Sequence, residues 1–473
     1  MKNTKKHSFT NDVLGTLDAT AIAALIKNKE LKASEVVEAS IARAKAVNPD
    51  INAIVTDNFE AGLASSNNIN NGFFQGIPIF IKDMTMVKGI PSYFGSEAFA
   101  NAKPAQKTDA IAKQIFDQGF VNMGTSSLPE FGFTCTTEFA NKEPTRNPWN
   151  LNHSTGGSSG GSAALVAAGV VPIAHSADGG GSTRIPAAAC GLVGLKPQRG
   201  RILLSGMLET QLVDLAVDGV LTRTVRDTAN FYAEAEKYYK NKKLPAIGLV
   251  EGPSNKKYKI GFSNQSVKSF SGDKQTYEVL KDTAKLLESL GHEVKEVEMP
   301  VKDQFHDDFV NLWSMLGFMT DKFGGLLFKN GFDKSKLSAL TTGLTSMYKK
   351  NMLKTPFFIN RLKKSYSDYQ QILKDLDVDL LLTPTVSSSA PEIGKMGVNM
   401  PFDEMFENVM EWACFTPYAN ACGCPAISLP VGHDLTKDLP IGMMAWSNHG
   451  LEKDLLDIAF QIEAAQPFKK IYI

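Results

Sequence analysis

The chain has 473 residues, of which 43% are apolar and 21% are charged, as is usual for a soluble globular protein. Its 50 basic residues balance 50 acidic ones, so we expect no broad positive surface for binding nucleic acid. The length alone favours two or three domains.

Five cysteines are spread over the chain, and an odd number does not suit a disulfide framework. Cys422 and Cys424 are separated by one residue, whereas common zinc and redox pairs are separated by two. We expect free thiols and no metal site. The N-terminus lacks the apolar stretch of a secretion signal, and the weakly polar run 163–174 is too short to cross a membrane. These features predict a cytoplasmic protein without membrane contact.

Residues 1–70 are predicted to form an N-terminal helical segment. Asp18 and Ser34 are each placed to cap a helix, because their side chains can accept backbone N–H groups at a helix start. Apolar residues follow each cap at helical spacing, at Ile22, Leu25 and Ile26 and then at Val37, Ile41 and Ala44.

Short apolar runs then alternate with helical patterns, which predicts an α/β fold with helices on the faces of a sheet. We predict strands at 77–81, 120–124, 170–174, 259–262, 293–297, 380–384 and 426–429, and helices at 111–119, 163–168, 275–290 and 455–465. Residues 150–155 are not expected to form a strand. Residues 300–370 are rich in Phe, Leu and Met and form either a helical insert that shapes a pocket or further core.

Two loops mix glycine with serine, GGSSGG at 156–161 and GGGSTR at 179–184. A flexible linker is disfavoured because the α/β pattern continues on both sides. A phosphate-binding loop requires a lysine directly after the glycines, and none follows. A dinucleotide site requires a strand directly before the glycines. A catalytic serine is the remaining interpretation.

The first loop fits GxSxG, the nucleophile turn of α/β-hydrolases, with Ser158 as the nucleophile. That mechanism requires a histidine later in the chain. His433 and His449 are available, although neither lies in a recognisable motif. We predict that His433 is an exposed loop residue.

The second loop offers a serine beside its own anion site. Three glycines before Ser182 leave the backbone free to point successive N–H groups into one concavity, where they can stabilise an oxyanion. A serine hydroxyl also needs a base. Lys82 fits this role, because an amine at the end of a buried strand is desolvated and has a lowered pKa. His175 is predicted to be a structural residue of a strand.

Four stretches together resemble the amidase signature family: residues 76–83 (GIPIFIKD), 156–161 (GGSSGG), 178–186 (DGGGSTRIP) and 190–197 (CGLVGLKP). The resemblance extends to residues 145–148 and 421–430 and so spans nearly the whole chain. It implies one amidase signature domain over 1–473, built as a mixed twisted β-sheet sandwiched between α-helices. This replaces the two-domain expectation from length.

The resemblance also implies a Ser-Ser-Lys triad for hydrolysis of an amide C–N bond through an acyl-enzyme, without metal or organic cofactor. Ser182 would be the nucleophile, Ser158 the bridging serine after a cis peptide bond, and Lys82 the base. The remaining implied roles are oxyanion-hole N–H donors at Gly179, Gly180, Gly181 and Ser182, and bracing residues at Ser159, Asp178 and Arg184. Thr155 stands where family members often have proline.

Phe133, Cys135 and Trp412 are predicted to bind the substrate in an apolar pocket, with packing in the core as the alternative. The motifs favour a stand-alone hydrolase of the 6-aminohexanoate cyclic-dimer type, which acts on a small-molecule amide and water. The alternatives are an amidotransferase subunit that supplies ammonia for tRNA-dependent amidation together with protein partners, an α/β-hydrolase-like esterase, and a non-catalytic binding protein. The oligomeric state is open, with a homodimer as one option.

Overall fold

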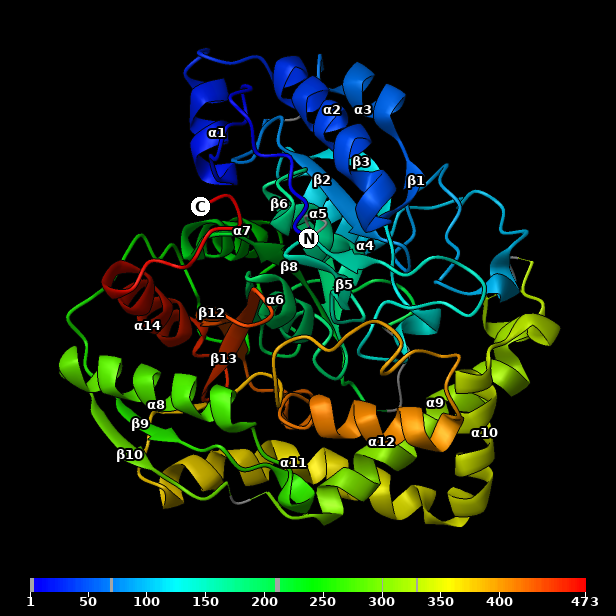
Figure 1. The fold of residues 1–473 in the computed structure, drawn as a ribbon, viewed down its shortest axis with the longest axis vertical. Coiled ribbons are helices and arrows are strands. Elements are labelled where there is room, and N and C mark those ends of the chain that lie inside the picture. Colours follow the sequence, from blue (N-terminus) through cyan, green and yellow to red (C-terminus); the bar gives the residue numbers. More distant parts are fainter. Residues whose placement is uncertain (1–3, 69–70, 209–212, 300, 329–330) are drawn as a thin grey trace.

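The computed structural model describes residues 4–68, 71–208, 213–299, 301–328 and 331–473 (Figure 1). The predicted N-terminal segment 1–70 and the predicted insert 300–370 each include a few residues that lie outside the described residues.

One large mixed sheet runs through the molecule (Figure 1). In the described ranges its strands, in spatial order, are β10 (Glu293–Glu296), β9 (Lys259–Phe262), β11 (Leu380–Pro384), β13 (Leu439–Ser447), β12 (Ala426–Asp434), β7 (Val193–Lys196), β8 (Val217–Thr222) and β6 (Ile173–Asp178). Strands β10, β9 and β11 pair in parallel, whereas the pairs from β11 to β6 are antiparallel. With the helices that cover it, this sheet confirms the predicted α/β fold class.

A second, three-stranded sheet has the order β1 (Ile54–Asp57), β3 (Val121–Ser126), β2 (Pro78–Lys82). The third sheet is a hairpin of β4 (Arg146–Asn147) and β5 (Asn150–Ser154). The prediction that 150–155 is not a strand is therefore wrong. The cause is local pairing, since Arg146 faces Ser154 and Asn147 faces Asn150 across a tight turn that single-strand patterning does not reveal.

The described helices are α1 (Ala19–Lys27), α2 (Ala33–Ile51), α3 (Phe59–Ser65), α4 (Ala110–Phe116), α5 (Gly160–Ala167), α6 (Arg184–Cys190), α7 (Val225–Tyr238), α8 (Lys274–Ser289), α9 (Gln304–Phe328), α10 (Ala339–Asn351), α11 (Thr355–Asp375), α12 (Phe402–Trp412), α13 (Pro417–Cys422) and α14 (Glu452–Ala465). Short 3-10 helices occupy Glu97–Phe99, Glu130–Gly132, Val267–Ser269, Lys334–Lys336 and Met352–Lys354. Figure 1 shows α9, α10 and α12 at the lower right of the molecule and α11 along its lower edge.

The two faces of the large sheet are buried in different clusters, because neighbouring residues of a strand point to opposite faces. Val220 packs in a cluster with residues of α7, α8 and α14, whereas Leu221 packs in a cluster with residues of α5 and α6. This places α6, which follows the second glycine loop, on the face opposite α7, α8 and α14.

Two predicted element starts are corrected by the structure. Asp18 caps α1 as predicted, accepting the N–H of Ala21, but α2 begins at Ala33 with Lys32 as its cap residue. Ser34 lies inside the first turn, because the Glu35 side chain accepts the Lys32 N–H instead. The strand predicted at 170–174 begins after Pro172 and continues as β6 to Asp178, which is its C-terminal residue.

All five cysteines are free, as predicted, and the structure shows that all five are buried. In the part of the chain that the structure describes, no helix combines the length and the apolar character needed to span a membrane.

Candidate active site

Lys82 is the last residue of β2, and its side chain is only 1% exposed. Its Nζ donates to Ser158 Oγ at 2.8 Å and to the Ala177 carbonyl at 3.3 Å. Burial lowers the pKa of Lys82 to about 7, although the nearby charges of Asp218 and Asp178 oppose this change. An amine with such a pKa can both take up and release a proton near neutral pH.

Ser158 lies in the first glycine loop, and the Gly157–Ser158 peptide bond is cis. The loop is anchored to the second glycine loop, because the Ser159 N–H donates to the Ser182 carbonyl at 3.2 Å. Glycine is required at 161, where a Cβ would lie 2.4 Å from the Ser127 backbone nitrogen. The close packing of this loop accounts for its glycines.

Ser182 lies in the loop between β6 and α6. The Asp178 carboxylate holds this loop by accepting the N–H groups of Gly181 at 2.8 Å and Thr183 at 3.2 Å. The prediction of Gly181 as an oxyanion donor is therefore not supported, because its N–H is bonded to Asp178. Gly179, Gly180 and Ser182 are half-exposed and line the cavity described below.

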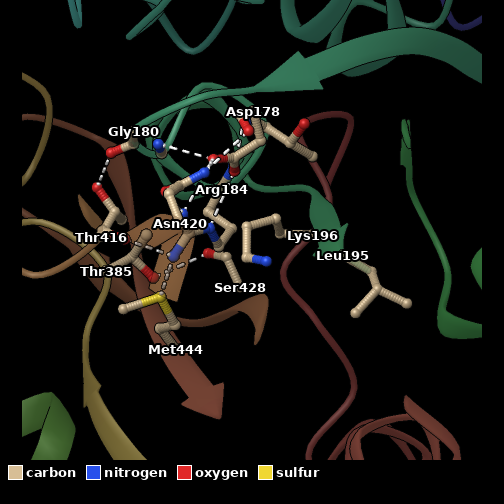
Figure 2. Close-up of polar contacts among 12 residues, drawn as sticks. Asp178, Gly180, Arg184, Leu195, Lys196, Thr385, Thr416, Asn420, Ser428 and Met444 are labelled. Carbon is tan, nitrogen blue, oxygen red and sulfur yellow. Dashed lines mark hydrogen bonds and ion pairs between the residues drawn. The ribbon is translucent and has the colours of Figure 1, made fainter. Parts of the chain in front are cut away.

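Asp178 and Arg184 form a fully buried ion pair beneath this loop (Figure 2). Arg184 Nε donates to Asp178 Oδ2 and Arg184 Nη2 donates to Asp178 Oδ1, each at 2.9 Å. Burial alone would raise the pKa of Asp178, but the charge and hydrogen bonds of Arg184 outweigh it and hold that pKa well below its usual range. The predicted bracing residues Asp178 and Arg184 thus contact each other and the loop.

Two residues that the sequence analysis missed complete this network (Figure 2). Asn420, on α13, accepts from Arg184 Nη2 at 2.6 Å and donates to the Asp178 carboxylate at 2.9 Å. Thr416, which precedes α13, donates its hydroxyl to the Gly180 carbonyl at 2.6 Å. Both contacts join positions 236 apart in the chain, so no local pattern could have indicated them.

A cavity of about 740 Å³ opens beside these loops, and Lys82, Ser158 and Ser182 all line it. Most of its wall is apolar, and includes Met84, Met86, Phe94, Phe131, Met207, Leu208, Leu215, Phe309, Trp313, Met315, Leu316, Met319, Phe328, Val409 and Met410. Nine of its wall residues lie on α9. The three catalytic candidates thus face a large, mostly apolar space.

Of the predicted substrate-binding residues, Phe133 and Cys135 line this cavity. Trp412 does not contribute to the wall as described, and its predicted role is not supported. Its indole N–H donates to the Ser388 carbonyl at 3.1 Å, and the residue is 4% exposed. Val409, Met410 and Ala413, from the same segment, line the cavity instead.

His433 and His449, the two histidines that could have served Ser158 as a base, form hydrogen bonds with other residues. His433 lies on β12 with Nε2 2.7 Å from Asp438 Oδ1, so the prediction of an exposed loop residue is wrong. Pairing of β12 with β13 extends the strand beyond the predicted end at 429. His449 contacts Gln198 and the Tyr366 carbonyl. The Ser158 hydroxyl is hydrogen-bonded to the Lys82 amine and not to a histidine.

Comparison with known proteins gives the same assignment as the motifs. Residues 35–456 match the protein-family model described as Amidase. The chain belongs to the amidase signature family. This confirms the predicted resemblance, and it shows that the chain is an amide-hydrolysing enzyme.

Relatives of this amidase cover its whole length. It is 41% identical over 468 residues to the candidate amidase AmiC of Mycobacterium leprae (strain TN), covering 99% of each chain. The solved structure of 6-aminohexanoate cyclic dimer hydrolase superposes with a TM-score of 0.85 at 28% identity, over 98% of this chain and 99% of that one. A glutamyl-tRNA(Gln) amidotransferase subunit of Persephonella marina (strain DSM 14350 / EX-H1) is 31% identical over 94% of this chain and 96% of that protein.

Proposed function

We propose that this amidase cleaves a carboxamide C–N bond through an acyl-enzyme on Ser182, with Ser158 and Lys82 relaying the proton. The observation that carries the proposal is the 2.8 Å hydrogen bond from Lys82 Nζ to Ser158 Oγ, in the wall of a cavity that Ser182 also lines. A pKa of about 7 suits Lys82 to act as base and then as acid.

In the first half-reaction, Ser182 Oγ attacks the carbonyl carbon. Its proton passes to Ser158 Oγ, while the Ser158 proton passes to Lys82 Nζ. The carbonyl oxygen becomes an anion, which the backbone N–H groups of Gly179, Gly180 and Ser182 stabilise. The C–N bond then breaks, and Lys82 returns its proton through Ser158 to the leaving amine.

In the second half-reaction, water attacks the Ser182 ester. The same relay removes the water proton and returns it to Ser182 Oγ, so that the carboxylic acid leaves and the enzyme is restored. Asp178, Arg184 and Ser159 hold the two loops in place and transfer no proton.

The preferred substrate carries a bulky apolar group on one side of its amide. A volume of about 740 Å³ is ample for a drug-sized molecule, and its wall offers mainly Met, Phe and Leu side chains. Glutamine would leave its charged α-groups against this wall without polar partners, which costs free energy. The cavity therefore favours a stand-alone amidase over the amidotransferase alternative. In this proposal α9 is the insert that shapes the pocket within one domain over 1–473.

The test is amine or ammonia release from a panel of glutamine, small aliphatic amides, anilides, peptide amides and cyclic amides. Wild type is expected to hydrolyse the apolar members fastest, and Ser182→Ala is expected to hydrolyse none. Mass spectrometry should find the trapped acyl group on Ser182. Acylation at Ser158, or full activity of Ser182→Ala, would disprove the mechanism.

Shortening one apolar wall residue should weaken substrate binding. Leu316→Ser removes part of the α9 wall, and we expect KM for an apolar amide to rise about tenfold, since a buried leucine contributes about 1.5–3 kcal/mol. Steady-state kinetics measure the change. Leu353→Ser is the matched control, because Leu353 is 92% exposed and lies outside the cavity wall described above. Equal KM values for both variants would contradict the assignment of the cavity as the substrate site.

A further inference from the structure

A histidine–aspartate pair lies directly behind Lys82. His175, on β6, accepts the backbone N–H of Lys82 on its Nδ1 at 3.2 Å. Its Nε2 lies 2.9 Å from Asp218 Oδ1, on the neighbouring strand β8. Both side chains are 0% exposed. The pair thus joins the end of β2 to the large sheet.

These bonds determine where the histidine proton lies. A backbone N–H can only donate, so Nδ1 of His175 accepts and the ring proton is on Nε2, facing Asp218. The other carboxylate oxygen of Asp218 accepts from the Ser205 backbone N–H at 2.7 Å and from the Ser205 hydroxyl at 3.3 Å. Asp218 is therefore a buried carboxyl group whose two oxygens are hydrogen-bonded by the His175 ring and by Ser205.

The other acidic groups near Lys82 act on it less. The charge of Asp178 also raises the pKa of Lys82, but it acts less than that of Asp218 and is paired with the Arg184 guanidinium. Asp83 follows Lys82 in the chain, and burial raises the pKa of its carboxyl well above its usual range, which favours the uncharged form. Asp218 has no ion pair to Lys or Arg among the described residues, and its charge is the one that raises the pKa of Lys82 most.

Two further titratable groups of this region, Tyr232 and Cys135, have raised pKa values. Tyr232, on α7, donates its hydroxyl to the Leu195 carbonyl at 2.8 Å, and burial raises the pKa of that hydroxyl well above the usual range. Cys135 lines the cavity beside Lys82, and burial raises the pKa of its thiol as well. Neither group supplies or removes charge at neutral pH.

We propose that His175 and Asp218 are positioning residues for Lys82. His175 fixes the backbone at the end of β2, and Asp218 supplies the buried negative charge that stabilises the ammonium form of Lys82. The inference rests on the proposed function, in which Lys82 gains a proton from Ser158 in each half-reaction and later returns it. An anion already in place favours that protonated state without reorganisation of solvent.

The test is the pH profile of kcat/KM for Asp218→Asn, with the best substrate of the amide panel. Asparagine keeps the shape and can still accept the Nε2–H of His175, but it removes the charge. Since an opposite charge at close range typically shifts a pKa by about 1–3 units, we expect the midpoint of the acid limb to fall by about one pH unit or more. We also expect kcat to fall several-fold, because Lys82 becomes a weaker base, with little change in KM.

Asp457→Asn is the matched control. Asp457 lies on α14 and is 5% exposed, and its carboxylate accepts a hydrogen bond from the Tyr258 hydroxyl at 2.7 Å. This variant also loses a buried carboxylate, and its midpoint should equal that of wild type. An Asp218→Asn enzyme that is slower at every pH with an unchanged midpoint would overturn the proposal and leave the pair a purely structural role.

If Asp218→Asn does not fold, Ser205→Ala provides the test in the opposite direction. It removes the hydroxyl that donates to Asp218, so the carboxylate is less screened and the midpoint should rise slightly. An unchanged or lowered midpoint would again overturn the inference. Activity that survives in Ser182→Ala would instead disprove the proposed function, whatever the midpoint of these variants.

Discussion

Replacing Lys82 with methionine is expected to reduce kcat by about 10²–10⁴-fold, the usual contribution of a general acid–base group. Methionine fills a similar volume but can neither accept the Ser158 proton nor return it to the leaving amine. In the wild-type enzyme, kcat/KM should rise through about pH 7 as Lys82 loses its proton, since burial lowers its pKa to about 7. The residual activity of Lys82→Met should lack this rise. Both are measured by initial rates across a pH series.

The Lys82→Met protein is expected to be folded and at least as stable as wild type. The pKa of Lys82 is lower in the folded chain, at about 7, than its ordinary value of 10.5. The unfolded chain therefore binds more protons between these values, so this group makes the free energy of unfolding increase with pH in that window. Any stability advantage of Lys82→Met should be largest below about pH 7 and shrink as the pH rises.

Lys88→Met serves as the control, because Lys88 is an exposed lysine six positions later. Its kinetics and pH profile should match those of wild type. A folded Lys82→Met enzyme with near-normal rates would refute the lysine relay, and a marked loss of thermal stability would show that the amine is needed for folding.

Replacing Arg184 with alanine is expected to destabilise the fold by about 3–5 kcal/mol and to remove activity. The change leaves Asp178 as a buried carboxylate without its cation, which is the costly way to break such a pair. It also frees the loop that carries Ser182, since Asp178 and Arg184 together hold that loop against Asn420. Denaturant unfolding measures the first effect and steady-state kinetics the second.

Arg146→Ala tests whether any arginine–carboxylate pair would have the same effect. Arg146 contacts Glu143 at 2.9 Å, but the Glu143 side chain is 77% exposed, so we expect a loss below about 1 kcal/mol. Similar destabilisation in the two variants would mean that burial of the Asp178–Arg184 pair is not what makes it important.

Much of the candidate site could be predicted from sequence because its candidate residues lie in short stretches with recognisable local patterns. An apolar run ending in Lys82, and two glycine–serine loops, each depend on a few neighbouring residues and their backbone freedom. Strands β9 and β11 were predicted to the residue, since short β-branched or leucine runs with clear flanking turns leave little ambiguity. The family resemblance then suggested the roles that are proposed for Ser158 and Ser182.

The predictions failed where a residue's contacts come from distant parts of the chain. The sequence suggested Gly181 as a donor, but the folded loop turns its N–H to Asp178. Trp412 was predicted to line the pocket, yet its indole N–H is hydrogen-bonded to the Ser388 carbonyl and the residue is absent from the cavity wall. Local patterns specify a helix or a loop but not which of its faces meets the site.

The sequence by itself therefore determined the family, the α/β class and the chemical character of Lys82, Ser158 and Ser182, because these depend on residue type and local backbone preference. Only the tertiary structure decided the pKa of Lys82, the bracing by Asn420 and the pairing of His175 with Asp218. Desolvation and charge act through space, between positions 43 or more residues apart, and they exist only once the sheets have assembled around the lysine.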